Sequence, residues 1–157
     1  MKKFNLSQAA PKPDSEDPPG FQAAMHRFGP EIGAKNLGGS VYDIPPGQAL
    51  CPYHYEISEE EWVIALAGRA SVRTPEGTQE LEVGDIVCFP PGAEGAHQIL
   101  NASEETARVM MISTVLTPAV CVYPDSDKIA VFVEGGADNV IVERSSDVGY
   151  FEGESYP

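Results

Sequence analysis

The chain has 157 residues, which is enough for one domain with a hydrophobic core and too few for two of ordinary size. Hydrophobic residues make up 42% of it and aromatic residues 8%, a composition that argues against wholesale disorder. Its 24 acidic and 10 basic residues give a formal net charge of −14. Because such a surface repels nucleic acid and anionic lipid, we expect neither as a partner.

The sequence shows no sign of membrane insertion or secretion. No apolar run approaches the length of a membrane span, and the residues after Met1 are polar where a signal peptide would have its apolar segment. The three cysteines, Cys51, Cys88 and Cys121, are widely separated and have neither zinc-binding spacing nor a paired framework. We interpret them as small, partly buried residues in a reducing compartment, and we expect a cytoplasmic location.

Residues 1–37 are predicted to form an N-terminal arm that is mostly irregular. Prolines are frequent within residues 1–20, at Pro11, Pro13, Pro18 and Pro19. Residues 21–26 could form a helical turn, which the pair Gly29-Pro30 would end.

From Gly38 onward the pattern changes to short β runs, about 8 to 12 residues apart, as is typical of an all-β barrel or sandwich. Strands are predicted over residues 39–44, 49–55, 60–67, 69–74, 78–82, 85–89, 96–101, 107–114, 119–123 and 128–133. No strand is followed by a long helical pattern, which argues against parallel α/β architectures. We therefore assign residues 38–133 to a β-barrel domain and residues 134–157 to a C-terminal extension, with a candidate outer strand at 140–143.

Two glycine-bounded segments contain the residues that could bind a metal or catalyse a reaction. The first, residues 47–68, contains His54, Glu56 and Glu61, and the second, residues 84–101, contains His97. His54 and Glu56 lie two residues apart, so on a strand both project from the same face. If these strands line one pocket, four side chains converge there, and imidazole with carboxylate is a normal ligand set for a divalent transition metal.

The two segments together resemble the paired motifs of the cupin superfamily. Glu61 is followed by six residues and Gly68, Gly84 by five residues and Pro90-Pro-Gly92, and His97 by three residues and Asn101. The resemblance covers roughly residues 38–115 and implies a small single-domain protein with an antiparallel double-stranded β-helix, or jelly-roll barrel. It also implies a metal held by His54, Glu56, Glu61 and His97.

Glu56 departs from the family pattern, which has a second histidine at this position. With both carboxylates ionised, a divalent ion would be formally neutralised, which favours a harder ion and a less acidic bound water. Glu56 could instead line the pocket, where burial beside Glu61 would raise one carboxyl pKa and leave a proton donor. Glu59 shares the strand parity of Glu61 and is the second choice for that ligand. The set does not distinguish Fe, Mn, Ni and Zn.

The sequence is compatible with two classes of function. The first is a metal-binding cupin that acts on or binds a small organic molecule and, if it is an enzyme, is a metal-dependent oxygenase or isomerase. The second is a metal-free protein that binds a sugar or another small molecule, or an isomerase or epimerase with Glu56 or His97 as its catalytic acid or base. Nothing in the sequence names the ligand.

Strand parity also predicts which residues face the pocket. Counting from Glu61, Val63 and Ala65 should share its face, while Trp62, Ile64 and Leu66 should point outward. Exposed edge strands and this outward apolar row predict a homodimer. By the same reasoning Cys51 should point away from His54 and stay out of the site.

Overall fold

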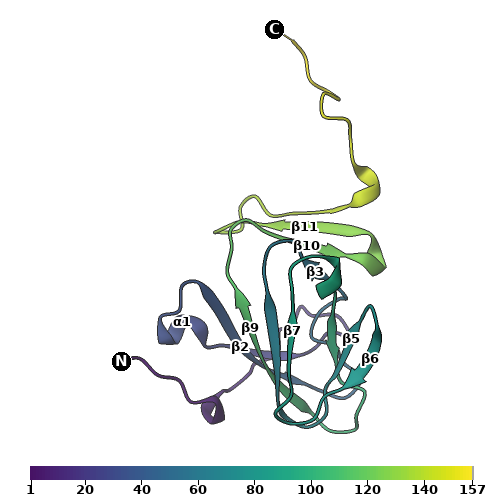
Figure 1. Ribbon diagram of the computed structural model, residues 1–157. Coiled ribbons are helices and arrows are strands. Elements are labelled where there is room, and N and C mark those ends of the chain that lie inside the picture. The colour runs from purple at the N-terminus through teal and green to yellow at the C-terminus, as the bar shows by residue number, and fades with distance from the viewer. Residues whose placement is uncertain (157) are drawn as a thin grey trace.

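The computed structural model describes residues 1–156, and in this range the protein is all-β with antiparallel strand pairing (Figure 1). The strands are β1 (Ala24–Arg27), β2 (Leu37–Ile44), β3 (Tyr55–Glu56), β4 (Glu61–Ala67), β5 (Ser71–Thr74), β6 (Gly77–Glu80), β7 (Ile86–Phe89), β8 (Gln98–Leu100), β9 (Ala107–Thr114), β10 (Ala119–Tyr123), β11 (Lys128–Phe132) and β12 (Val140–Glu143). The short helical elements are α1 (Gly29–Ile32) and the 3₁₀ turns η1 (Leu6–Gln8), η2 (Ala93–Gly95), η3 (Pro124–Ser126) and η4 (Arg144–Ser146). Among residues 1–156, no helix has the length and apolar character needed to cross a bilayer.

The strands form three sheets that pack as a sandwich. The largest has the order β1-β2-β9-β4-β7, the second β12-β11-β10-β3 and the third β6-β5-β8. In Figure 1, β10 and β11 run across one end of β7 and β9, while β5 and β6 lie to their side. The candidate outer strand at 140–143 is present as β12 and pairs with β11.

Most predicted strands are present within a few residues of their expected bounds, and the all-β class is confirmed. The main difference is the segment 49–55, where only the isolated bridges of Ala49 and His54 precede the two-residue strand β3. Pro52 lies in this segment, and proline cannot donate a ladder hydrogen bond. The other difference is β1. The sequence allowed a helical turn over residues 21–26, but residues 24–27 form a strand because they pair with β2. Tertiary pairing overrides local propensity there.

The core lies on the inner face of the five-stranded sheet. Along β4 the side chains alternate as predicted: Val63 and Ala65 are buried, whereas Trp62 is exposed and Ile64 is half-buried. The buried residues form one cluster, whose larger members are Ile44, Val63, Val72, Leu81, Phe89, Ile99 and Val109. This cluster anchors β4, whose first residue is Glu61, and β8, which begins one residue after His97.

The N-terminal arm lies against β1. The ring of Phe4 stacks on Phe28 with centroids 5.2 Å apart, and it lies 5.0 Å from the ring of His26. The backbone amide of Ala10 donates to His26 Nδ1 at 2.9 Å. These contacts hold the arm and β1 together on the edge of the large sheet. The pairing of β1 with β2 directs Arg27 to the same face as Glu61 and His26 to the opposite face.

Candidate metal centre

Two segments that are far apart in the sequence pair directly at the site. The amide of His54 donates to the carbonyl of His97 at 3.0 Å, and the amide of His97 donates to the carbonyl of His54 at 2.8 Å. This narrow bridge holds the two imidazole rings side by side, with centroids 4.8 Å apart. Phe89 stacks on the other side of His97 at 3.7 Å and fixes that ring within the core.

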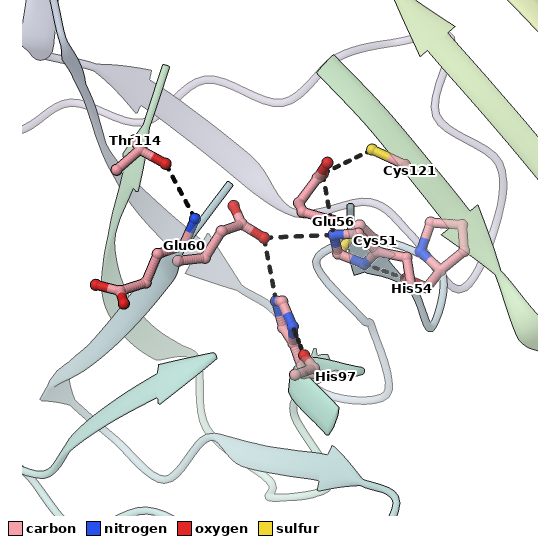
Figure 2. Close-up of polar contacts among 10 residues, drawn as sticks. Cys51, His54, Glu56, Glu60, His97, Thr114 and Cys121 are labelled. Atoms are coloured by element: carbon pink, nitrogen blue, oxygen red, sulfur yellow. Dashed lines mark hydrogen bonds and ion pairs between the residues drawn. The ribbon is translucent and has the colours of Figure 1, made fainter. Parts of the chain in front are cut away.

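Glu61, the first residue of β4, reaches both imidazoles. Its Oε2 lies 3.5 Å from His54 Nε2 and 3.4 Å from His97 Nε2. One ligand atom from each of the three residues lies within 4.8 Å of the others, so these residues could hold a metal ion. Figure 2 shows the rings of His54 and His97 directed toward this common point.

The outer nitrogens of both rings are held by the backbone. His54 Nδ1 lies 2.9 Å from the carbonyl of Pro52, and His97 Nδ1 lies 2.9 Å from the carbonyl of Gly95. A carbonyl can only accept a hydrogen bond, so each Nδ1 carries a proton, and whenever the ring is neutral its lone pair is at Nε2. Such contacts orient metal-binding histidines in proteins generally.

Three buried polar atoms at the site have no hydrogen-bond partner among residues 1–156: Glu61 Oε2, His97 Nε2 and Glu56 Oε2. Leaving a buried polar atom unpaired costs about 1–3 kcal/mol, so native proteins rarely do it without a reason. All three are atoms that can bind a cation or a polar ligand. The residues therefore fit a divalent ion, which would satisfy Glu61 and His97 together.

The site is strongly polarised in the metal-free protein. Burial lowers the pKa of the His54 imidazole, but its contacts with Cys51 and Glu61 outweigh burial and raise that pKa to about 11. Burial and the charge on His54 lower the pKa of His97 to about 4. At neutral pH His54 is thus protonated beside the Glu61 carboxylate, while His97 is neutral.

Glu56 lies near His54 but is not part of the group formed by His54, Glu61 and His97. Its Oε1 is 4.0 Å from His54 Nε2 and accepts a hydrogen bond from the thiol of Cys121 at 2.6 Å (Figure 2). Burial raises the pKa of the Glu56 carboxyl, although the Cys121 hydrogen bond opposes this. The structure therefore places Glu56 beside His54, with one carboxylate oxygen held by Cys121 and the other, Oε2, buried and unpaired.

The other carboxylates of the acidic run do not reach the imidazoles. Glu59 Oε1 accepts from the amide of Leu116 at 2.6 Å, and Glu60 Oε1 accepts from the indole of Trp62 at 2.8 Å. Figure 2 shows the Glu60 carboxylate pointing away from His54 and His97. The spacing of Glu61 to Gly68 thus selected the carboxylate that lies at the site.

The expectation that Cys51 points away from His54 is wrong. Its Sγ lies 3.6 Å from His54 Nδ1, because the chain from Cys51 to Tyr53 does not continue as a regular strand and parity does not hold. Sequence reasoning also missed Cys121, which meets Glu56 because β10 pairs with β3 in the register Cys121↔Glu56. No local signal reveals this pairing, since the two strands are far apart in the sequence.

The terminal residues of the two motifs serve the scaffold. Gly68 has a φ of 66°, and a Cβ there would lie 2.6 Å from the carbonyl oxygen of Thr106. Asn101 is buried, and its side-chain amide donates to the carbonyls of Ile44 and Glu105 at 2.7 Å each. These residues fix the turns that follow β4 and β8, the strands at whose starts Glu61 and His97 lie.

Comparisons with known proteins support this fold. The family model described as "Cupin domain" matches residues 40–113. A crystal structure of a protein provisionally named sugar phosphate isomerase, from Acidithiobacillus ferrooxidans, is 26% identical with a TM-score of 0.81, covering 92% of this chain and 91% of that one. The chain thus contains a cupin-like domain over residues 40–113.

Two further solved structures support the fold. A sugar phosphate isomerase of the cupin superfamily from Silicibacter pomeroyi is 19% identical with a TM-score of 0.80, covering 96% of this chain and 98% of that one. A Cupin 2 conserved barrel domain protein from Salinispora arenicola is 22% identical with a TM-score of 0.56, covering 73% and 89%. No curated protein matches the sequence.

Proposed function

We propose that this protein is a metal-dependent cupin isomerase that binds a sugar phosphate or a closely related hydroxycarbonyl compound. The observation that carries the proposal is the convergence of His54 Nε2, Glu61 Oε2 and His97 Nε2, two of them buried atoms without a partner among residues 1–156. The substrate class is supported by the structural neighbours named as sugar phosphate isomerases, which align over almost the whole chain.

His54, Glu61 and His97 would hold a divalent first-row ion, and Glu56 is the candidate for a fourth ligand. Two imidazoles and one carboxylate leave positions open on such an ion. When bound, the ion supplies a Lewis acid that polarises a carbonyl or hydroxyl oxygen of the substrate. The Nδ1 contacts of both histidines with backbone carbonyls keep Nε2 directed at the site.

The surroundings of Glu56 favour a role in proton transfer over ligation. The Cys121 thiol holds Oε1, and Oε2 is buried without a hydrogen-bond partner among residues 1–156. In an aldose–ketose conversion, Glu56 takes the proton from the carbon next to the carbonyl and returns it to the former carbonyl carbon. The carbonyl oxygen gains a proton and the neighbouring hydroxyl loses one, so the reaction is balanced without an oxidant or reductant.

A metal-free binding protein or isomerase is the second candidate. It is favoured by the 3.5 Å contact of His54 with Glu61 and by the raised pKa of His54, because a protonated imidazole already balances the buried carboxylate. The same pocket residues, Glu56 and His97, would then contact the ligand directly. Elemental analysis of protein purified without added metal separates the two candidates.

We also propose that the three sheets close into the jelly-roll barrel expected of a cupin. Two isolated bridges support this closure, because Ala49↔Leu100 and His54↔His97 connect the segment before β3 to the strand region of β8. In such a barrel the metal centre lies at the mouth, where a small molecule has access.

Substitution of a proposed ligand should remove the metal. We expect His54→Ala, Glu61→Ala and His97→Ala each to lose most of the bound first-row metal, because each removes one donor atom from a three-residue set. Glu56→Gln should retain it if Glu56 transfers protons and should lose a clear part of it if Glu56 is a ligand. Metal content by mass spectrometry of folded variants is the measurement. His26→Ala is the matched control, and equal content in all variants would refute the metal site.

Metal affinity should fall as the pH falls. The range from about pH 6 to pH 9 lies above the pKa of His97 and below that of His54. In this range the imidazole of His97 is neutral and that of His54 carries a second proton in the metal-free protein. Ligation requires neutral imidazole, so each ion bound displaces this proton and the dissociation constant should rise about tenfold per unit decrease in pH. Titration calorimetry in buffers of different ionisation enthalpy measures the proton release. A pH-independent affinity would show that His54 does not ligate.

The isomerase proposal predicts exchange of a carbon-bound hydrogen with solvent. Metal-loaded protein incubated with aldose and ketose phosphates in D₂O should incorporate deuterium next to the carbonyl, as followed by proton NMR. Glu56→Gln should reduce this exchange by a factor of about 10² or more, since general acid–base catalysis contributes about 10²–10⁴-fold. Absence of exchange with every sugar phosphate tested would leave only the binding function.

A homodimer formed through the outer face of the five-stranded sheet belongs to the same proposal. Trp62 pairs with Ile112 and Cys88, and Ile64 pairs with Met110 and Ile86, so these apolar residues form one surface. Light scattering at micromolar concentration should give the mass of a dimer, and Ile86→Glu should shift it toward the monomer by burying a charge. Ile141→Glu, at a similarly exposed position on β12, is the control. A monomeric wild-type protein would contradict the dimer.

A further inference from the structure

A cavity of about 250 Å³ lies on the inner face of the large sheet and adjoins the metal centre at Glu61. Its polar lining comes from four neighbouring strands: Arg27 on β1, Ser40 and Tyr42 on β2, Ser113 on β9 and Glu61 on β4. Strand register explains why these side chains share a face. Residues paired across antiparallel strands project from the same side, and the pairs Arg27↔Ser40 and Glu61↔Ser113 lie in adjacent rows of this sheet.

Arg27 and Glu61 stand at opposite ends of the cavity. Three strand-to-strand steps separate β1 from β4, which is about 14 Å between their backbones at the usual spacing of about 4.8 Å. Both long side chains extend over the inner face and shorten this gap. The remaining space suits a small molecule that contacts the metal centre at one end and the guanidinium at the other.

Arg27 has no acidic partner within the part of the chain that the structure describes. Arg69, Arg73 and Arg108 each form an ion pair with a carboxylate, whereas no carboxylate oxygen of residues 1–156 lies within 4.0 Å of the Arg27 guanidinium. Arg144 is also without an ion pair in this range, but it lies in η4, outside this cavity. In a chain with a net charge of −14, an exposed cation that lines a cavity and has no carboxylate beside it is available to an external anion. The planar guanidinium matches phosphate and carboxylate by paired hydrogen bonds.

Gly38 keeps the middle of this cavity open. It occupies an inner-face position of β2 opposite Ser113, and its φ lies outside the left-handed region, so the backbone does not require glycine. A Cβ there would lie 2.7 Å from Ser113 Oγ and 3.6 Å from a methyl carbon of Val115, so the Ser113 side chain would have to move. Any side chain at this position would enter the cavity between Arg27 and Glu61.

We propose that Arg27 forms an anion subsite that receives the phosphate of the substrate, while the carbonyl end of that substrate lies at His54, Glu61 and His97. The inference rests on the proposed function for the identity of the substrate and for the position of its carbonyl end. The anion subsite at Arg27 does not depend on it. Arg27 lies outside residues 40–113, the range that the cupin family model matches. The added edge strand β1 thus supplies the group that selects a phosphorylated ligand.

Inorganic phosphate is the direct probe, titrated into the protein as purified and followed by calorimetry or ³¹P NMR. We expect Arg27→Met to weaken phosphate binding at least tenfold, and Gly38→Val to do the same by filling the cavity. Arg69→Met, which removes an exposed arginine on another sheet, should leave it unchanged. Equal phosphate binding by Arg27→Met and the wild-type protein, or no binding by the wild-type protein, would overturn the subsite.

A second comparison separates this inference from the proposed function. His97→Ala should lose metal but keep phosphate binding, because the subsite is independent of the metal centre. If His97→Ala loses phosphate binding and Arg27→Met keeps it, the anion sits at the metal and the subsite is refuted. Fructose 6-phosphate and glucuronate then identify the anion: tighter binding than fructose and glucose respectively, lost in Arg27→Met, assigns a phosphate ester or a carboxylate.

Discussion

The backbone pairing of His54 with His97 is the interaction on which the site depends. Two reciprocal hydrogen bonds hold together segments from separate motifs, and the chain between Cys51 and Tyr53 is otherwise irregular. The pairing places both imidazoles on one side, where Glu61 reaches them from the start of β4. Loss of the bridge would separate the rings even if each side chain remained intact, so the scaffold and the metal centre are one structural unit.

This arrangement also explains how a carboxylate can be buried without a fixed partner. Glu61 and Glu56 both lie within 4.0 Å of His54 Nε2, and two ionised carboxylates there would repel each other strongly at low dielectric. The protein separates their environments: Glu61 faces two imidazoles, whereas Glu56 accepts from the Cys121 thiol, which burial and the Glu56 charge keep protonated by raising its pKa. Carboxyl groups with unlike surroundings can take unlike roles.

Much of the fold could be predicted because side-chain alternation and motif spacing can be read within a single segment of the sequence. Alternation along 61–67 and 107–114 reports a sheet with one buried face, and the motif spacing singled out Glu61 among three consecutive glutamates. The failures concern long-range pairing. Cys121 meets Glu56 only through the register of β10 with β3, and Cys51 reaches His54 only because Pro52 interrupts the strand. Arg27 likewise gains its importance from the pairing of β1 with β2, since nothing in residues 21–27 marks a strand that faces a cavity.

The large negative charge of the protein bears on how an anionic ligand could be bound at all. A net charge of −14 opposes the approach of a phosphate ester at long range, although at physiological ionic strength this repulsion is screened beyond about 8 Å. At the cavity itself, the charges in direct contact with the anion decide the interaction. Arg27 at one end and a divalent ion at the other would offset the surrounding acidic surface there, whereas a cation paired with a carboxylate would not. An anionic substrate therefore requires an unpaired arginine at this position more than it would in a basic protein, which is the physical reason to regard the edge strand β1 as part of the binding site.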